Sequence, residues 1–99
     1  MKVLVIEDSR MLRLATERIL VKNGYEVTGI GDGHQGILLA QQSRPDAILL
    51  DMMLPGLEGT KVLDQLKQNK ATESIPVIVL SGLSEERGKA QNGRSSRLF

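Results

Sequence analysis

The sequence predicts an α/β fold, with a doubly wound parallel sheet covered by helices on both faces. Short apolar runs at residues 2–6, 46–50 and 77–80 alternate with segments whose apolar residues recur at helical spacing. Continuous apolar runs are typical of strands buried on both faces, as in parallel sheets. Short connections between these strands and helices favour right-handed crossovers, which make successive strands run in the same direction.

The first strand–helix unit occupies the start of the chain. We expect a strand over residues 2–6 and a helix over residues 9–22. The apolar residues at helical spacing in this helix are Met11, Leu12, Ala15, Ile19 and Leu20. Asn23-Gly24 should end the helix, because glycine accepts the left-handed conformation that closes many helices.

A second unit follows directly. Residues 25–30 form the second strand, and Asp32 caps a helix that runs to about Gln42. Arg44-Pro45 ends this helix, because proline disfavours helical conformation in the residue before it. A third strand over residues 46–50 comes next.

The remaining elements follow the same alternation. A helix opens at Glu58 or Gly59, and Pro76 introduces the fourth strand at residues 77–80. Ser84 begins a fourth helix that Asn92-Gly93 would end. We place the core of the domain at residues 1–86 and an atypical basic tail at residues 87–99, in which residues 96–99 form a stub of a fifth strand.

Three acidic residues follow two of the predicted strands. Glu7 and Asp8 come after the strand 2–6, and Asp51 comes after the strand 46–50. Ligands in open α/β sheets bind outside the carboxyl ends of the strands, so these residues should share one edge. Three carboxylates repel one another unless a divalent cation shares them, and Mg²⁺ prefers oxygen ligands. We therefore expect a Mg²⁺ site, with Asp8 as a helix cap and Asp51 as a solvated acid as the simpler alternative.

Composition restricts the function classes. The 99 residues suit one domain, and the chain has no cysteine for disulfides or thiolate chemistry. No apolar run approaches the roughly 18 residues of a membrane span, and Met1-Lys2 leads straight into a strand without a signal segment, so we expect a cytoplasmic protein. Four cations without an acid make residues 87–99 basic, which we interpret as a solvated tail and not as a nucleic-acid site.

The motifs together resemble the receiver domain of two-component response regulators. The resemblance covers residues 2 to about 84 and depends on the acidic pair Glu7-Asp8, on Asp51 with the following segment 52–59, and on Ser81-Gly82 after the fourth strand. It implies the flavodoxin-like strand order 2-1-3-4-5. It also implies a phosphorelay signalling domain that catalyses at most its own phosphorylation.

The resemblance assigns a role to each site residue. Asp51 accepts a phosphoryl group from a phosphohistidine on a sensor histidine kinase or phosphotransfer protein. Asp8 binds Mg²⁺ directly, Glu7 binds it through water, and the Met53 backbone carbonyl and Asp51 complete the protein ligands. The Ser81 hydroxyl acts as the switch that contacts the phosphoryl group, and the Gly82 amide is a second donor. Any output would pass through a separate protein, without direct contact to nucleic acid or membrane.

The end of the sequence departs from the family pattern. The resemblance implies a fifth βα unit with a lysine, whereas the sequence reaches Phe99 without a matching lysine, so the fifth unit is missing or rudimentary. The strand 77–80 would then be an apolar edge that invites self-association, and we expect a homodimer or a marginally stable monomer. A non-switching receiver that acts as a binding or dimerisation module is therefore the alternative function.

Two further motifs have competing interpretations. Residues 31–36 spell G-x-G-x-x-G between a strand and a helix, a pattern of dinucleotide sites. The motif follows the second strand instead of the first, so we interpret it as a helix-capping turn with His34 at the surface. Aspartyl phosphatases use D-x-D, but Met53 occupies the second position after Asp51, so we expect slow hydrolysis of any phosphoaspartate.

Overall fold

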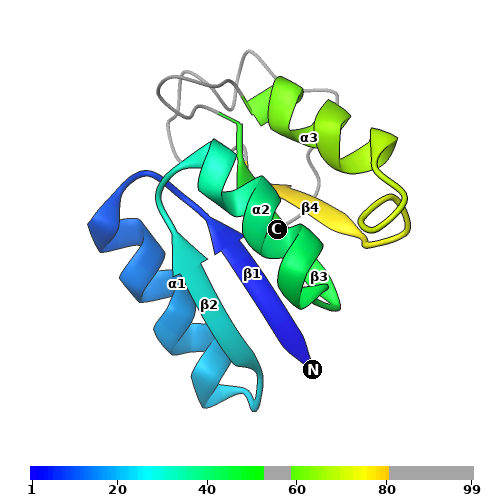
Figure 1. Ribbon diagram of the computed structural model, residues 1–99. Helices are drawn as coiled ribbons and strands as arrows, with labels where there is room; N and C mark the ends of the chain where they lie inside the picture. Colours follow the sequence, from blue (N-terminus) through cyan, green and yellow to red (C-terminus); the bar gives the residue numbers. More distant parts are fainter. Residues whose placement is uncertain (53–58, 81–99) are drawn as a thin grey trace.

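The computed structural model describes residues 1–52 and 59–80, in which strands and helices alternate along the chain (Figure 1). The elements are β1 (Lys2–Ile6), α1 (Arg10–Lys22), β2 (Glu26–Ile30), α2 (Gly33–Ser43), β3 (Ala47–Asp51), α3 (Gly59–Gln68) and β4 (Val77–Leu80). The predicted order of elements is confirmed over this range, with boundaries that differ by about one residue. The predicted fourth helix and the stub of a fifth strand lie outside the described residues.

The strands form a parallel sheet in the order β2-β1-β3-β4. This order confirms the predicted one as far as β4. Ile6 pairs with Ile30 of β2 on one side and with Leu50 of β3 on the other, so the three strands end at the same level. Asp51 pairs with Leu80 at the end of β4. The carboxyl ends of the four strands therefore lie at one edge of the sheet.

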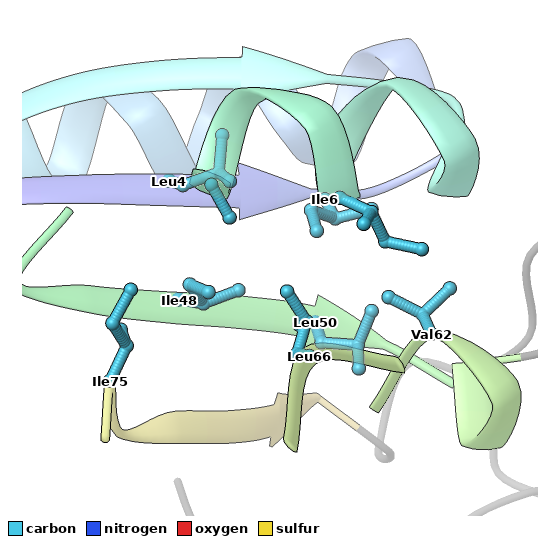
Figure 2. Close-up of a cluster of buried hydrophobic side chains, with 9 residues drawn as sticks. Leu4, Ile6, Ile48, Leu50, Val62, Leu66 and Ile75 are labelled. Atoms are coloured by element: carbon cyan, nitrogen blue, oxygen red, sulfur yellow. The ribbon is translucent and has the colours of Figure 1, made fainter. Parts of the chain in front are cut away.

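Helices α2 and α3 cover one face of the sheet and enclose the larger part of the core (Figure 2). Side chains from β1 and β3 meet side chains from α3 there, because alternate residues of each strand point to the same face. The buried members are Leu4, Ile6, Ile37, Ala40, Ile48, Leu50, Val62, Leu66 and Ile75. This core fixes β1 beside β3 and so fixes the edge at which both strands end.

Helix α1 covers the opposite face above β1 and β2 (Figure 1). Of its apolar residues at helical spacing, Leu20 packs against the buried cluster on this face, whereas Met11 and Ile19 are 76% and 62% exposed. The half-buried positions include Arg13 and Glu17, which lie over β2. The spacing thus predicted the helix correctly, but its apolar stripe does not coincide with the side that faces the sheet.

The caps agree with the sequence in three of four places. Asp32 caps α2 by accepting a hydrogen bond from the Gln35 amide, and Gly24 after α1 has a φ of 93°. Arg44 ends α2 in the left-handed conformation, directly before the proline. The cap of α1 is Ser9, whose hydroxyl accepts from Leu12 N at 3.2 Å. The alternative role of Asp8 as the helix cap is therefore wrong.

Replacing Asp32 with Ala should lower the free energy of unfolding by about 1 kcal/mol, because the Gln35 amide loses its acceptor at 3.1 Å. Urea unfolding followed by circular dichroism measures this change. Asp64→Ala on the exposed side of α3 is the matched control and should change stability by less than about 0.5 kcal/mol. Equal stability of the Asp32 variant and the wild type would contradict the assigned cap.

Candidate functional site

Two buried carboxylates meet at the carboxyl edge of the sheet. Glu7 follows β1 and is 2% exposed, while Asp51 is the last residue of β3 and is 3% exposed. The pairing of Ile6 with Leu50 places the ends of these strands side by side, and the negative charge of Asp51 acts on Glu7. Acidic side chains are rarely this buried unless they are paired or bind a metal, so the arrangement marks a functional site.

The conformation of Glu7 is fixed at three points. Its amide donates to the Ile30 carbonyl at 3.0 Å, and its carbonyl accepts from Arg13 Nη1 at 2.9 Å. Its Oε2 accepts from the Ser9 amide at 2.9 Å. The other carboxylate oxygen, Oε1, is buried and has no hydrogen-bond partner among residues 1–52 and 59–80. A buried acceptor without a partner is costly, and it is the atom that an incoming ligand would satisfy.

Burial raises the pKa of Glu7 from its usual 4.5 to about 7. The hydrogen bond from the Ser9 amide opposes this shift, and the negative charges of Asp51 and Asp8 add to it. A bound cation would reverse these effects by favouring the ionised carboxylate. The raised pKa of Glu7 therefore reflects the unfavourable free energy of burying acidic side chains close to one another.

The other predicted site residues are placed differently. Asp8 lies in the turn between β1 and α1 and is exposed. Within the described part of the chain, no three acidic or histidine side chains are gathered closely enough to hold a metal ion. The structure thus brings Glu7 and Asp51 together but not Asp8, whose role as a ligand stays a prediction. Met53, Ser81 and Gly82 lie outside the described residues.

The donor atoms that are present suit a hard divalent cation. Glu7 and Asp51 offer carboxylate oxygens, and Glu7 Oε1, which no residue in 1–52 or 59–80 hydrogen-bonds, is an acceptor that a metal-bound water could satisfy. Mg²⁺ keeps several waters and takes few protein ligands, so two or three carboxylates at this edge of the sheet are sufficient. The residues therefore fit the predicted magnesium site.

Residues 31–36 have structural roles. Asp32 caps α2, and a Cβ on Gly36 would lie 2.6 Å from Ile6 Cδ1, so glycine allows α2 to approach β1 closely. His34 is exposed. These contacts support the helix-capping interpretation of the G-x-G-x-x-G motif.

Arg13 is a site neighbour that sequence reasoning missed. Its guanidinium reaches from α1 to the Glu7 carbonyl and is held beside the end of β2. The signal in the sequence was a pair of glycines two residues apart, Gly29 in β2 and Gly31 directly after it, which leave space for a long side chain.

A parallel sheet in the order 2-1-3-4 with buried carboxylates at its carboxyl edge defines a class of single-domain α/β proteins that bind ligands at this edge. The family model of the response regulator receiver domain matches residues 3–94, and the chain belongs to this family. The match runs past residue 86, where we placed the end of the core.

Sequence relatives agree with this assignment. Protein PilH of Pseudomonas aeruginosa is 32% identical over 93 residues, which are 94% of this chain and 77% of PilH. Sensory transduction protein RegX3 of Mycolicibacterium smegmatis is 39% identical over 87 residues, which are 88% of this chain and 37% of RegX3. The chain thus spans most of PilH but little more than a third of RegX3.

Solved structures show the same fold. The receiver domain of sensor histidine kinase PA1611 from P. aeruginosa, with a magnesium ion coordinated in its active-site cleft, matches with a TM-score of 0.81 and 29% identity over 90% of this chain and 73% of that one. Chemotaxis protein CheY4 of Vibrio cholerae matches with a TM-score of 0.77 and 28% identity over 92% and 79%. The flavodoxin-like receiver fold is confirmed.

These findings favour a phosphorelay role over the alternative of a non-switching binding module. The chain is a response regulator receiver domain related to two-component regulators. In the described ranges, no helix combines the length and the apolar character needed to cross a membrane.

Proposed function

We propose that this receiver accepts a phosphoryl group on Asp51 from a phosphohistidine of a sensor histidine kinase or phosphotransfer protein. The observation that carries the proposal is the buried pair Asp51 and Glu7 at the carboxyl edge of the sheet, where no described residue hydrogen-bonds to Glu7 Oε1. Membership of the receiver family supports it. The domain would act as a phosphoacceptor that catalyses at most its own phosphorylation.

The transfer is a substitution at phosphorus. A carboxylate oxygen of Asp51 attacks the phosphorus and forms the new P–O bond, while the P–N bond to the histidine breaks. The electron pair of that bond leaves with the imidazole, which is protonated at its other ring nitrogen and departs neutral. The product is an acyl phosphate on Asp51. Burial at a fixed strand end orients the attacking oxygen, which is the main contribution that the protein can make.

Asp51, Asp8, the Met53 carbonyl and, through water, Glu7 would hold the Mg²⁺ ion. When bound, the ion neutralises charge on the oxygens of the transferring phosphoryl group. The magnesium ion in the receiver domain of PA1611 supports this assignment. Glu7 in its ionised form would accept a hydrogen bond through Oε1 from a water on the ion and so help to hold it.

Ser81 and Gly82 would receive the phosphoryl oxygens. Leu80 pairs with Asp51, so the chain leaves β4 beside the phosphoacceptor, and this register supports the assignment. The hydroxyl of Ser81 and the amide of Gly82 are suitable donors to a group that carries about two negative charges. Movement of the Ser81 hydroxyl toward the phosphoryl group would carry the signal into the segment that follows.

Magnesium dependence tests the proposed function. The purified chain incubated with a small acyl-phosphate donor and Mg²⁺ should gain the mass of one phosphoryl group, measured on the intact protein. With a chelator in place of Mg²⁺, the uptake should be about a hundredfold slower, because the charge of the phosphoryl oxygens is not neutralised. A folded protein that gains no mass, or gains it equally fast with the chelator, would contradict the proposal.

A further inference from the structure

The side chain of Arg13 joins helix α1 to the ends of two strands. Its Nη1 donates to the Glu7 carbonyl at 2.9 Å, and its Nε lies 4.0 Å from Glu17 Oε2, one turn further along the helix. The side chains of Arg13 and Glu17 are 21% and 27% exposed. Arg13 is therefore held in one place by two partners, although it lies near the surface.

Two glycines make room for this arrangement. A Cβ on Gly31 would lie 2.9 Å from Arg13 Nη1, and a Cβ on Gly29 would lie 3.0 Å from Arg13 Cγ and collide with Glu17 Oε2. Gly29 lies in β2 and Gly31 directly follows the strand, and both positions face the Arg13 side chain. Glycine at both positions leaves room for the Arg13 side chain beside the end of β2.

The bond from Arg13 completes the fixation of Glu7. The amide of Glu7 is bound to Ile30, and Oε2 is bound to the Ser9 amide. The Glu7 carbonyl belongs to the peptide bond that leads into Asp8, so its direction sets the direction in which the chain continues. Without Arg13, this peptide could rotate. The directions of Glu7 Oε1 and of the Asp8 side chain would then no longer be fixed.

We propose that Arg13 is a positioning residue of the metal site, which holds the Glu7–Asp8 peptide and so fixes the direction of the Glu7 carboxylate beside Asp51, where Mg²⁺ would bind. This inference rests on the proposed function. Arginine suits the task because its planar guanidinium directs separate nitrogens to the Glu7 carbonyl and to Glu17. Lysine offers one compact ammonium group and would retain only part of this geometry.

The first test compares the Mg²⁺ affinities of Arg13→Met and Arg18→Met by titration calorimetry. Both variants remove one positive charge from α1, but Arg18 is exposed on the helix and makes no contact with Glu7 in the described residues. Arg13→Met should bind Mg²⁺ about tenfold more weakly than the wild type, the usual effect of losing a group that orients a ligand. Arg18→Met should stay within about twofold of the wild type.

Two further readouts separate positioning from general stability. Arg13→Lys should recover part of the lost affinity, since its ammonium can still donate to a carbonyl. Saturating Mg²⁺ should restore the phosphorylation rate of Arg13→Met toward that of the wild type. The variant should differ from the wild type only in needing a higher Mg²⁺ concentration to reach half of this rate. A rate that remains low at saturating Mg²⁺ would overturn the inference.

Substitution of Gly31, which lies against the Arg13 guanidinium, is an independent test. Gly31→Ala should weaken Mg²⁺ binding in the wild-type background, because its Cβ displaces the guanidinium. In the Arg13→Met background, Gly31→Ala should cause little further loss of Mg²⁺ affinity, since the guanidinium that its Cβ would displace is already absent. Thermal unfolding verifies that each variant is folded. If Arg13→Met does not fold, the two single variants Arg13→Lys and Gly31→Ala are compared with the wild type instead.

The outcomes distinguish the two proposals. Equal Mg²⁺ affinity of the wild type, Arg13→Met and Gly31→Ala would overturn the role of Arg13 and leave the proposed function intact. Additive losses of Mg²⁺ affinity in the double variant of Arg13→Met and Gly31→Ala would also overturn the role of Arg13. Failure of the folded wild-type protein to bind Mg²⁺ would contradict the proposed function and this inference with it.

Discussion

Replacing Asp51 with Asn is expected to abolish phosphoryl uptake. The amide has nearly the same shape as the carboxylate, but it is neutral and lacks the nucleophilic oxygen that forms the bond to phosphorus. Asp51 is 3% exposed at the end of β3, and the substitution removes a negative charge beside Glu7, so the fold should be preserved. Intact mass after incubation with an acyl-phosphate donor and Mg²⁺ should show one added phosphoryl group in the wild type and none in the variant.

Asp64→Asn supplies the matched control, because Asp64 is an exposed aspartate on α3, outside the buried pair. This variant should gain the phosphoryl mass at the wild-type rate. Uptake by the Asp51 variant at the wild-type rate would show that another residue is the acceptor. Circular dichroism and thermal unfolding verify that both variants remain folded.

The stability of the metal-free protein is expected to fall as the pH rises from about 5 to 8. The pKa of Glu7 is about 7 in the folded protein, above its usual 4.5, so the folded state binds more protons than the unfolded state between these values. The favourable contribution of Glu7 to stability is complete below its unfolded-state pKa of 4.5 and is lost as the pH rises through its folded-state pKa of about 7. The free energy of unfolding should decrease by an amount on the order of 2 to 3 kcal/mol over this range.

Glu7→Gln isolates this effect, because glutamine keeps the shape of the protonated side chain and does not titrate. Urea unfolding in a chelator-containing buffer should give a markedly flatter pH dependence for the variant than for the wild type. The stability difference should grow in favour of Glu7→Gln at pH 8. Parallel pH profiles of the two proteins would show that Glu7 does not have the raised pKa.

Much of the fold was readable from the sequence because it depends on local patterns. The apolar runs predicted β1, β3 and β4, and Asp32 and Gly24 marked helix boundaries through their conformational preferences. The meeting of Glu7 with Asp51 followed from the rule that parallel strands deliver their last residues to one edge. These features require no knowledge of how distant side chains pack.

The features that were missed depend on tertiary packing. The apolar spacing of α1 predicted a helix but not which side faces the sheet, and Met11 and Ile19 are largely exposed. The contact of Arg13 with the Glu7 carbonyl reaches from α1 to the end of β1, and Gly29 and Gly31 leave room for the arginine side chain. Likewise, only the packed structure shows that Glu7 Oε1 has no hydrogen-bond partner in the described part of the chain.

Reductive trapping of the phosphorylated protein directly tests whether Asp51 is the residue that accepts the phosphoryl group. Borohydride reduces an aspartyl phosphate to an alcohol and thereby converts the modified aspartate into homoserine, which peptide mass spectrometry can locate. After incubation of the wild-type chain with Mg²⁺ and an acyl-phosphate donor, we expect homoserine at position 51 and at no other position. Trapping at another residue, or none in a sample that has gained the phosphoryl mass, would contradict the assignment of Asp51.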